Sequence, residues 1–409
     1  MRPRGHAAVV RRPTARPPRA VSELPGSSHL AEATMAETPD ATTVPITPFT
    51  GPALWRGPAV AGRDDWVLTL SAGHQEELRT AVRTVRRRAA PLLRMTVADF
   101  PLPTLSAVLE RAGAALTRGR GFVLLRGVPP NLLGEAEAGI VLHGLGQYLG
   151  RPVSQTSDGR TLCHVRDAGA APGGSAPPAY RTRAAMPFHT AESDLLGLLC
   201  LRPARAGGHT LLASAAAVHN AVLAARPDLA RHLYRTHPFD RQPEQESGED
   251  TSLLCPLVTR HGDRPSMRYD RDRLADGFRD SEPDRVGDVD SELYTLIDTT
   301  AASPALRLEL HLGPGDLLLL DNHVVLHGRS AYDDFDAPQA KRHLLRLWLA
   351  RPDDTTPDEQ AAGAAERPAT RTGVAPRDVI RPRGPGMASP GRGCPPPRAH
   401  RDEMRTHPS

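Results

Sequence analysis

The sequence is poor in aromatic residues and in cysteine. Phenylalanine, tryptophan and tyrosine make up 4% of its 409 residues, which leaves few rings on which nucleic-acid bases could stack. The formal net charge of +4 is dispersed, because arginines alternate with aspartates and glutamates, so we expect no nucleic-acid partner. The four cysteines, Cys163, Cys200, Cys255 and Cys394, form no CxxC pair, so neither a zinc knuckle nor a disulfide framework is predicted.

Long apolar runs are also missing. No stretch of about 18 apolar residues occurs, and no apolar segment of an export signal follows the arginine pair Arg11–Arg12. We therefore expect a cytoplasmic protein without a membrane partner, whose oligomeric state the sequence does not indicate. Prolines and glycines crowd the two ends, which predicts disordered segments at 1–44 and 355–409 around a folded domain at 45–354. Met35 is an alternative start.

The order of elements indicates a mostly β fold buttressed by helices. Helices are predicted at 71–88, where a serine caps the first turn, at 103–119 and over 135–153. The run GFVLLRG predicts a buried strand, and from HVRD onward short strands with turn signals follow up to about Ala350, with one helix from about Ala215. Helices followed by many non-consecutive strands favour a β-sandwich or jelly roll over a doubly wound sheet.

Two histidines stand beside small residues at the ends of apolar strands: His189 in PFHTA and His327 in VVLHGRS. Either one alone would be interpreted as a core histidine that bonds a backbone carbonyl. A jelly roll can bring two such distant strands together at its mouth, where two histidines and one carboxylate hold a mononuclear iron. The pair is therefore a candidate metal site.

Three further polar residues suit the same cavity. Arg342 and Arg346 lie four apart on a predicted strand, so both point to one face. A buried guanidinium needs a carboxylate partner, which is either structural or part of a dicarboxylate cosubstrate. Thr210, the last residue of GGHT, adds a hydroxyl donor just after a glycine pair.

In these segments the chain resembles the TauD/TfdA family of Fe(II)/2-oxoglutarate-dependent dioxygenases, the taurine dioxygenase and clavaminate synthase group. The similarity extends from about Leu54 to Pro352 and is strongest in GRGFVLLRG, GRPVSQ, HVRD, PFHT, DLLGLLCLRPARAGG, GDLLLLDNHVVLHGRSAYDD and KRHLLRLWL. The resemblance implies a double-stranded β-helix (clavaminate synthase-like) that uses Fe(II) and converts 2-oxoglutarate to succinate. It also implies attack on an aliphatic C–H bond of a small molecule.

The resemblance also assigns roles by position. His189 and His327 correspond to the two iron-ligating histidines. Arg342 corresponds to the residue that binds the distal carboxylate of 2-oxoglutarate, and Thr210 to its hydroxyl partner. Arg346 corresponds to a neighbouring position that in some members contacts an anionic group of the substrate.

The sequence departs from the family at one ligand. The family motif is H-x-D or H-x-E, whereas here it reads His189, Thr190, Ala191. Three outcomes follow. Chloride fills the vacant position and the substrate is halogenated, or Glu192 or Asp194 replaces the carboxylate and the substrate is hydroxylated, or tight metal binding is lost.

The two acidic neighbours are not equivalent substitutes. Glu192 has the wrong parity for a regular strand and would need a bulge to reach the metal, and Asp194 is interpreted as structural. The third outcome corresponds to the alternative class for this chain, a catalytically impaired or non-enzymatic jelly-roll protein that keeps the pocket. The substrate itself stays open.

Overall fold

A computed structural model describes residues 46–89, 91–156, 159–169, 177–240, 252–281 and 287–351. The predicted disordered segments at 1–44 and 355–409, and the alternative start at Met35, lie outside these residues. No helix among the described residues is both long enough and apolar enough to cross a membrane.

The larger sheet has seven strands. Their order is β1 (Val67–Thr69), β2 (Phe122–Arg126), β14 (Asp316–Asp321), β6 (Leu195–Arg202), β17 (His343–Ala350) and β3 (Arg151–Val153), and β4 (Leu162–Val165) also pairs with β17. Every pairing except that of β1 with β2 is antiparallel. Neighbouring strands of this sheet come from distant parts of the chain, as is typical of a jelly roll.

The smaller sheet has four strands in the order β13 (Leu308–Leu310), β8 (Thr210–Ser214), β15 (Val325–Arg329) and β5 (Met186–His189). Its inner face packs on the inner face of the larger sheet through one apolar cluster, to which Leu212 and Leu310 contribute from one side and Leu198 and Leu318 from the other. Three two-stranded sheets complete the β structure of the described residues: β7 (Ala206–Gly207) with β16 (Tyr332–Asp333), β9 (Thr236–Asp240) with β10 (Ser252–Pro256), and β11 (Val258–His261) with β12 (Arg264–Met267).

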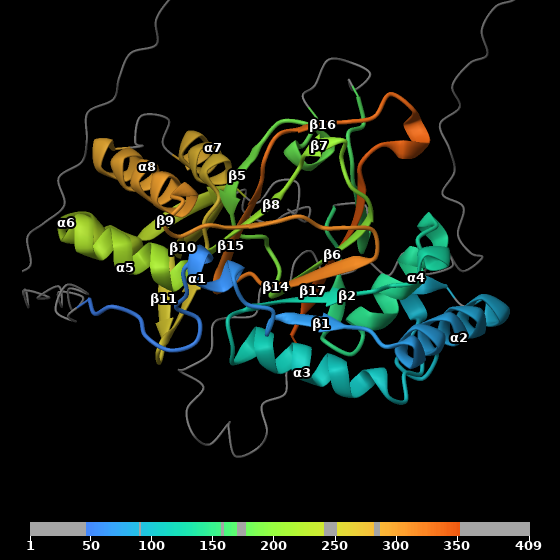
Figure 1. Ribbon diagram of the computed structural model, residues 1–409. Coiled ribbons are helices and arrows are strands. Elements are labelled where there is room, and N and C mark those ends of the chain that lie inside the picture. Colours follow the sequence, from blue (N-terminus) through green and yellow to red (C-terminus); the bar gives the residue numbers. More distant parts are fainter. Residues whose placement is uncertain are drawn as a thin grey trace, which may run out of the picture. The chain divides into compact units, whose positions relative to one another are not determined.

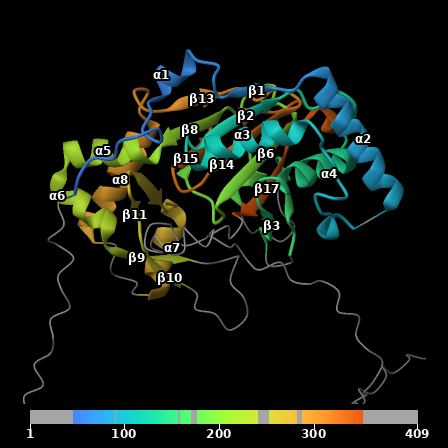
Figure 2. The ribbon, with the colours of Figure 1, turned by 90° about the horizontal axis from the view of Figure 1, so that it is seen from below.

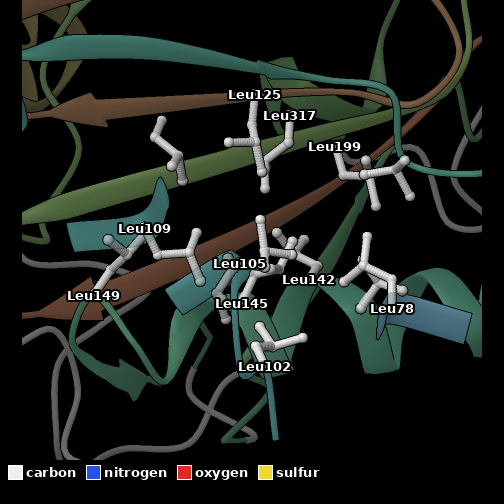
Figure 3. Packing of buried hydrophobic residues seen from close by; sticks show 14 of the residues in the cluster. Leu78, Leu102, Leu105, Leu109, Leu125, Leu142, Leu145, Leu149, Leu199 and Leu317 are labelled. Carbon is white, nitrogen blue, oxygen red and sulfur yellow. The ribbon is translucent and has the colours of Figure 1, made fainter. Parts of the chain in front are cut away.

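Helices cover the outer faces of the two sheets (Figures 1 and 2). The larger sheet is covered by α2 (Ala72–Arg88), α3 (Leu105–Thr117) and α4 (Glu135–Gly146), whose leucines interlock with Leu125, Leu199 and Leu317 of the strands (Figure 3). The smaller sheet carries α5 (Ala215–Ala225) and α8 (Asp288–Ala302), with α6 (Pro227–Ala230) and α7 (Arg271–Ser281) beside them; α1 (Gly57–Ala61) contacts β13. The molecule is thus a β-sandwich between two helical layers.

Local signals explain the elements that were expected. Ser71 accepts a hydrogen bond from the His74 amide and caps α2, and Ser214 caps α5 in the same way. Two predictions were wrong. The segment 135–153 is not helical throughout, because its end pairs with β17 as β3, and the polar helix α7 and the helix α8 interrupt the run of strands.

Acid should destabilise the fold through His143 on α4. This side chain is 1% exposed, and burial lowers its pKa to about 4. Because an unfolded histidine titrates near pH 6.5, the stabilisation is complete above that pH and is lost as the pH falls from 6.5 toward 4, by about 1 kcal/mol per pH unit. In urea unfolding at a series of pH values, His143→Gln should flatten this decline. An unchanged slope would contradict the assignment.

Candidate active site

The two predicted histidines lie side by side. His189 ends β5 and His327 lies in β15, and the antiparallel register of these strands makes them direct cross-strand partners. Their ring centroids are 4.3 Å apart with the planes inclined at 46°. Residues from distant parts of the sequence therefore form one imidazole pair at the wall of the cavity between the sheets.

The hydrogen bond of His189 is of the kind that metal-ligating histidines make. Nδ1 of His189 lies 2.9 Å from the Pro187 carbonyl, so it donates a proton there and leaves Nε2 as the free acceptor. His327 is 7% exposed and its Nδ1 has no hydrogen-bond partner. Burial, and then the charges of His189 and Arg346, hold the pKa of His327 well below its ordinary value. Both rings fit a divalent cation, which binds neutral imidazole.

No carboxylate completes this pair. Over the described ranges, no third histidine, cysteine, aspartate or glutamate forms a three-ligand group with His189 and His327. Ala191 is 6% exposed, and its amide donates to Oδ1 of Asn322 at 3.3 Å. The same Asn322 donates from Nδ2 to the Ser193 carbonyl at 2.9 Å. Asn322 thus fixes the loop around the missing ligand.

Both acidic residues of this loop are engaged elsewhere. The Glu192 carboxylate forms an ion pair with Arg268 at 3.1 Å, and the two side chains are only 17% and 18% exposed. Asp194, which is 1% exposed, accepts from Nε2 of His323 at 2.8 Å and from the Arg351 amide at 2.8 Å. Both carboxylates are thus paired with other side chains rather than with the two histidines.

Arg342 lies on the opposite side of the same cavity, directly before β17. It is 3% exposed, and its Nη1 has no hydrogen-bond partner. A Cβ on Gly208, whose φ is +70°, would lie 3.0 Å from Nε of Arg342, so glycine lets the backbone approach the guanidinium. Thr210, 5% exposed, faces the cavity beside it. The unpartnered nitrogen and the neighbouring hydroxyl together suit a carboxylate ligand.

Arg346 also lines the cavity, on the same face of β17 as Leu344. Its Nε donates to Oε1 of Gln155 at 2.6 Å, and its guanidinium carbon lies 4.7 Å above the Tyr180 ring. The expectation that Arg342 and Arg346 share a face agrees with this geometry, and the intervening Leu345 packs on the helical side.

Arg329, which lines the cavity, and Tyr332, which lies beside Arg329 and Arg342, were missed from the sequence. The Tyr332 ring lies 5.0 Å from the guanidinium carbons of both Arg329 and Arg342. A signal was available, because Arg329 follows His327 by two positions in HGR and a strand residue two places on shares the same face.

A second cluster of residues of the types that bind metals includes His343, which directly follows Arg342 in the sequence. Ring nitrogens of His164 and His343 are 2.8 Å apart, and Glu135 lies beside them. Two guanidinium groups already occupy this set, since Arg166 donates to Glu135 at 3.0 Å and Arg202 contacts Nδ1 of His343 at 3.0 Å. These cations supply the positive charge that a metal would bring, so we interpret the set as an ion-pair network.

Comparison with known proteins identifies the family. The profile described as taurine catabolism dioxygenase TauD, TfdA family, matches residues 87–348. The chain belongs to the TauD/TfdA family. FR-33289 synthase of Streptomyces rubellomurinus is 30% identical over 309 residues, 74% of this chain and 90% of that protein. Taurine hydroxylase-like protein SAT17 of Stachybotrys chartarum is 28% identical over 313 residues, 72% of this chain and 77% of its own.

Solved structures confirm the fold class. Asparagine oxygenase in complex with Fe(II), 2S,3S-3-hydroxyasparagine and succinate superposes with a TM-score of 0.56 at 19% identity, over 69% of this chain and 93% of that one. The non-heme iron oxygenase OrfP in complex with Fe and alpha-ketoglutaric acid gives 0.51 at 19% identity, with the same coverage. The TauD/TfdA chain described here is accordingly an iron- and 2-oxoglutarate-dependent oxygenase that acts on a small molecule.

We expect the removal of the two carboxylates of this loop to lower the free energy of unfolding by different amounts. Asp194→Asn should lower the unfolding free energy by about 2–4 kcal/mol, because it disrupts a buried charge-assisted pair with His323. Glu192→Gln, the matched control in the same loop, should cost less, because the Glu192–Arg268 pair is less buried than the Asp194–His323 pair and the glutamine oxygen can still accept a hydrogen bond. Chemical denaturation of both variants measures the difference. Equal costs would contradict a purely structural role for Asp194.

Proposed function

We propose that His189 and His327 together hold one Fe(II) ion. The proposal is supported by the cross-strand register of the two residues and by the Pro187 carbonyl, which fixes the tautomer of His189. It is also supported by the lowered pKa of His327, which keeps that ring neutral. Neutral imidazole is the form that binds a metal.

We further propose that 2-oxoglutarate lies across the cavity, with its distal carboxylate on Arg342 and Thr210. The unpartnered Nη1 of Arg342 supports this assignment, because a buried guanidinium without an acceptor is unfavourable. Apolar side chains of Leu196, Leu198 and Leu344 line the space between and keep water from it. When iron, 2-oxoglutarate and dioxygen are bound, decarboxylation to succinate supplies the oxidising power for attack on an aliphatic C–H bond.

In the family motif a carboxylate is the third protein ligand of the iron. We propose that here a ligand from solution takes that position. The main support for this proposal is the engagement of Glu192 with Arg268 and of Asp194 with His323. Chloride at that position leads to halogenation, which we propose as the reaction this loop favours. Hydroxylation, with water at the position, is the second candidate, because relatives are named hydroxylase and dioxygenase.

We propose an anionic substrate. Arg346 borders the cavity and its positive charge reaches His327. Among the relatives, one from Amycolatopsis is named uridine-5'-phosphate dioxygenase and another is named taurine hydroxylase-like, and both of those named compounds carry an anionic group. The alternative is a binding protein that keeps the pocket without turnover.

Turnover separates enzyme from binding protein. The purified chain with Fe(II), 2-oxoglutarate and oxygen should form succinate, measured by mass spectrometry. His327→Ala should reduce that rate by more than about 100-fold, because it removes a direct ligand and such losses exceed those from outer-shell changes. His343→Ala, outside the proposed iron site, is the matched control for loss of an imidazole. Absence of succinate across candidate small anions would favour the binding protein.

The vacancy itself is tested by Ala191→Asp. Restoring a carboxylate should strengthen Fe(II) binding by about tenfold or more and abolish incorporation of chloride or bromide into product. Ala191→Gly keeps the position open and should leave halide incorporation in place. Calorimetry under nitrogen measures the iron affinity, and mass spectrometry with bromide in the buffer measures the product. Halide incorporation that persists in Ala191→Asp would refute the vacancy argument.

A further inference from the structure

Arg329 lies at the end of the cavity where the distal carboxylate of the keto acid was placed. It follows His327 by two residues on β15, so both side chains share the inner face of that strand. Across the strands its direct register partner is Thr210. The hydroxyl assigned above to the carboxylate is therefore the cross-strand neighbour of this second guanidinium.

The hydrogen bonding of Arg329 is one-sided. Its Nη2 donates to the carbonyls of Thr182 at 2.8 Å and Ala184 at 2.5 Å, in the segment that precedes β5. The whole residue is only 4% exposed, and its Nε and Nη1 are buried without a hydrogen-bond partner. One side of the guanidinium is thus fixed to the backbone. The other donors are left for an acceptor that the described chain does not supply.

The surroundings of Arg329 add to this imbalance. The guanidinium carbons of Arg329 and Arg342 both lie 5.0 Å from the centre of the Tyr332 ring, so two cations share one buried ring. The carboxylate of Asp167 pairs with Arg183 at 3.2 Å, and Oδ1 of Asp334 accepts from the Arg342 amide at 2.6 Å, and in the described part of the chain neither forms a hydrogen bond with Arg329. Two buried cations with open donors are unfavourable together unless an anion joins them.

We propose that Arg329 is a second binding residue for the distal carboxylate of 2-oxoglutarate, which it shares with Arg342. The inference rests on the proposed function and deepens it. A site with one guanidinium and one hydroxyl would accept several kinds of acidic group. Two guanidinium groups around one carboxylate favour a keto acid that carries a carboxylate at its far end. Arg329 thus determines which keto acid this site accepts.

A purely structural role for Arg329 makes a different prediction. If its only purpose were to hold the 182–184 segment through Nη2, its loss would weaken every ligand of the cavity to a similar degree. The proposal instead requires an effect that depends on the distal carboxylate. The decisive comparison is 2-oxoglutarate against 2-oxopentanoate, which has the same chain length and keto acid end but carries a methyl group there.

The experiment uses the full chain loaded with Fe(II) under nitrogen, with dissociation constants measured by calorimetry. Arg329→Gln should weaken 2-oxoglutarate at least about tenfold and change 2-oxopentanoate less than about twofold. Arg329→Lys should be intermediate, because it keeps the charge but loses the fork. Arg183→Gln is the matched control, since Arg183 lies in the same segment, is largely exposed and pairs with Asp167 at 3.2 Å.

The outcomes separate the two proposals. If the wild-type chain binds 2-oxoglutarate and Arg329→Gln binds it equally well, the inference fails and the proposed function stands. Equal weakening of both keto acids in Arg329→Gln and Arg329→Lys would also overturn it in favour of a structural role. If the wild-type chain binds no 2-oxoglutarate, the proposed function itself fails. Circular dichroism melting of each variant shows whether a loss of affinity reflects a loss of fold.

Discussion

The pairing of β5 with β15 is the constraint on which the site depends. His189 and His327 are register partners in an antiparallel pair, so their side chains lie on the same face of the smaller sheet. A slip of one residue would send one imidazole to the helical layer, because side chains alternate along a strand. On its other edge, β15 pairs with β8, and that register places Arg329 opposite Thr210. The two alignments of β15 therefore fix both the histidine end and the arginine end of the cavity.

A second constraint acts on the loop that lacks its carboxylate. Asn322 bonds Ala191 and Ser193, while the amide of Thr190 donates to the Tyr269 carbonyl at 2.7 Å. The loop is held at both ends, so a rotation that aims Glu192 at the histidines would break buried hydrogen bonds as well as its ion pair. Buried polar groups that lose partners carry the full desolvation cost. The loop thus accommodates Ala191 while Glu192 and Asp194 stay paired with other side chains.

Local patterns predicted the strands and the two histidines because those signals are short-range. Apolar runs between glycines and prolines marked β2, β6 and β14, and a serine marked the start of α2. The polar helix α7 escaped because its sequence, RDRLADGFRDS, is short and dominated by charged residues, so its few apolar side chains gave a weak signal. The partners of Glu192 and Asp194 could not be foreseen, since Arg268 and His323 come from other strands and loops. Their choice is made by tertiary packing, which a single sequence does not display.

The distribution of charge in the cavity bears on the choice between enzyme and binding protein. Arg329 and Arg342 keep open donors in a buried space, and Arg346 adds a third cation to the lining of the cavity. Such a cavity favours an anion whether or not a metal is bound, because the Coulomb interaction is strong where water is excluded. Anion binding therefore does not distinguish the two classes. The distinction lies at the histidine pair, because two imidazoles held as register partners with ring centroids 4.3 Å apart suit a metal ion rather than an anion.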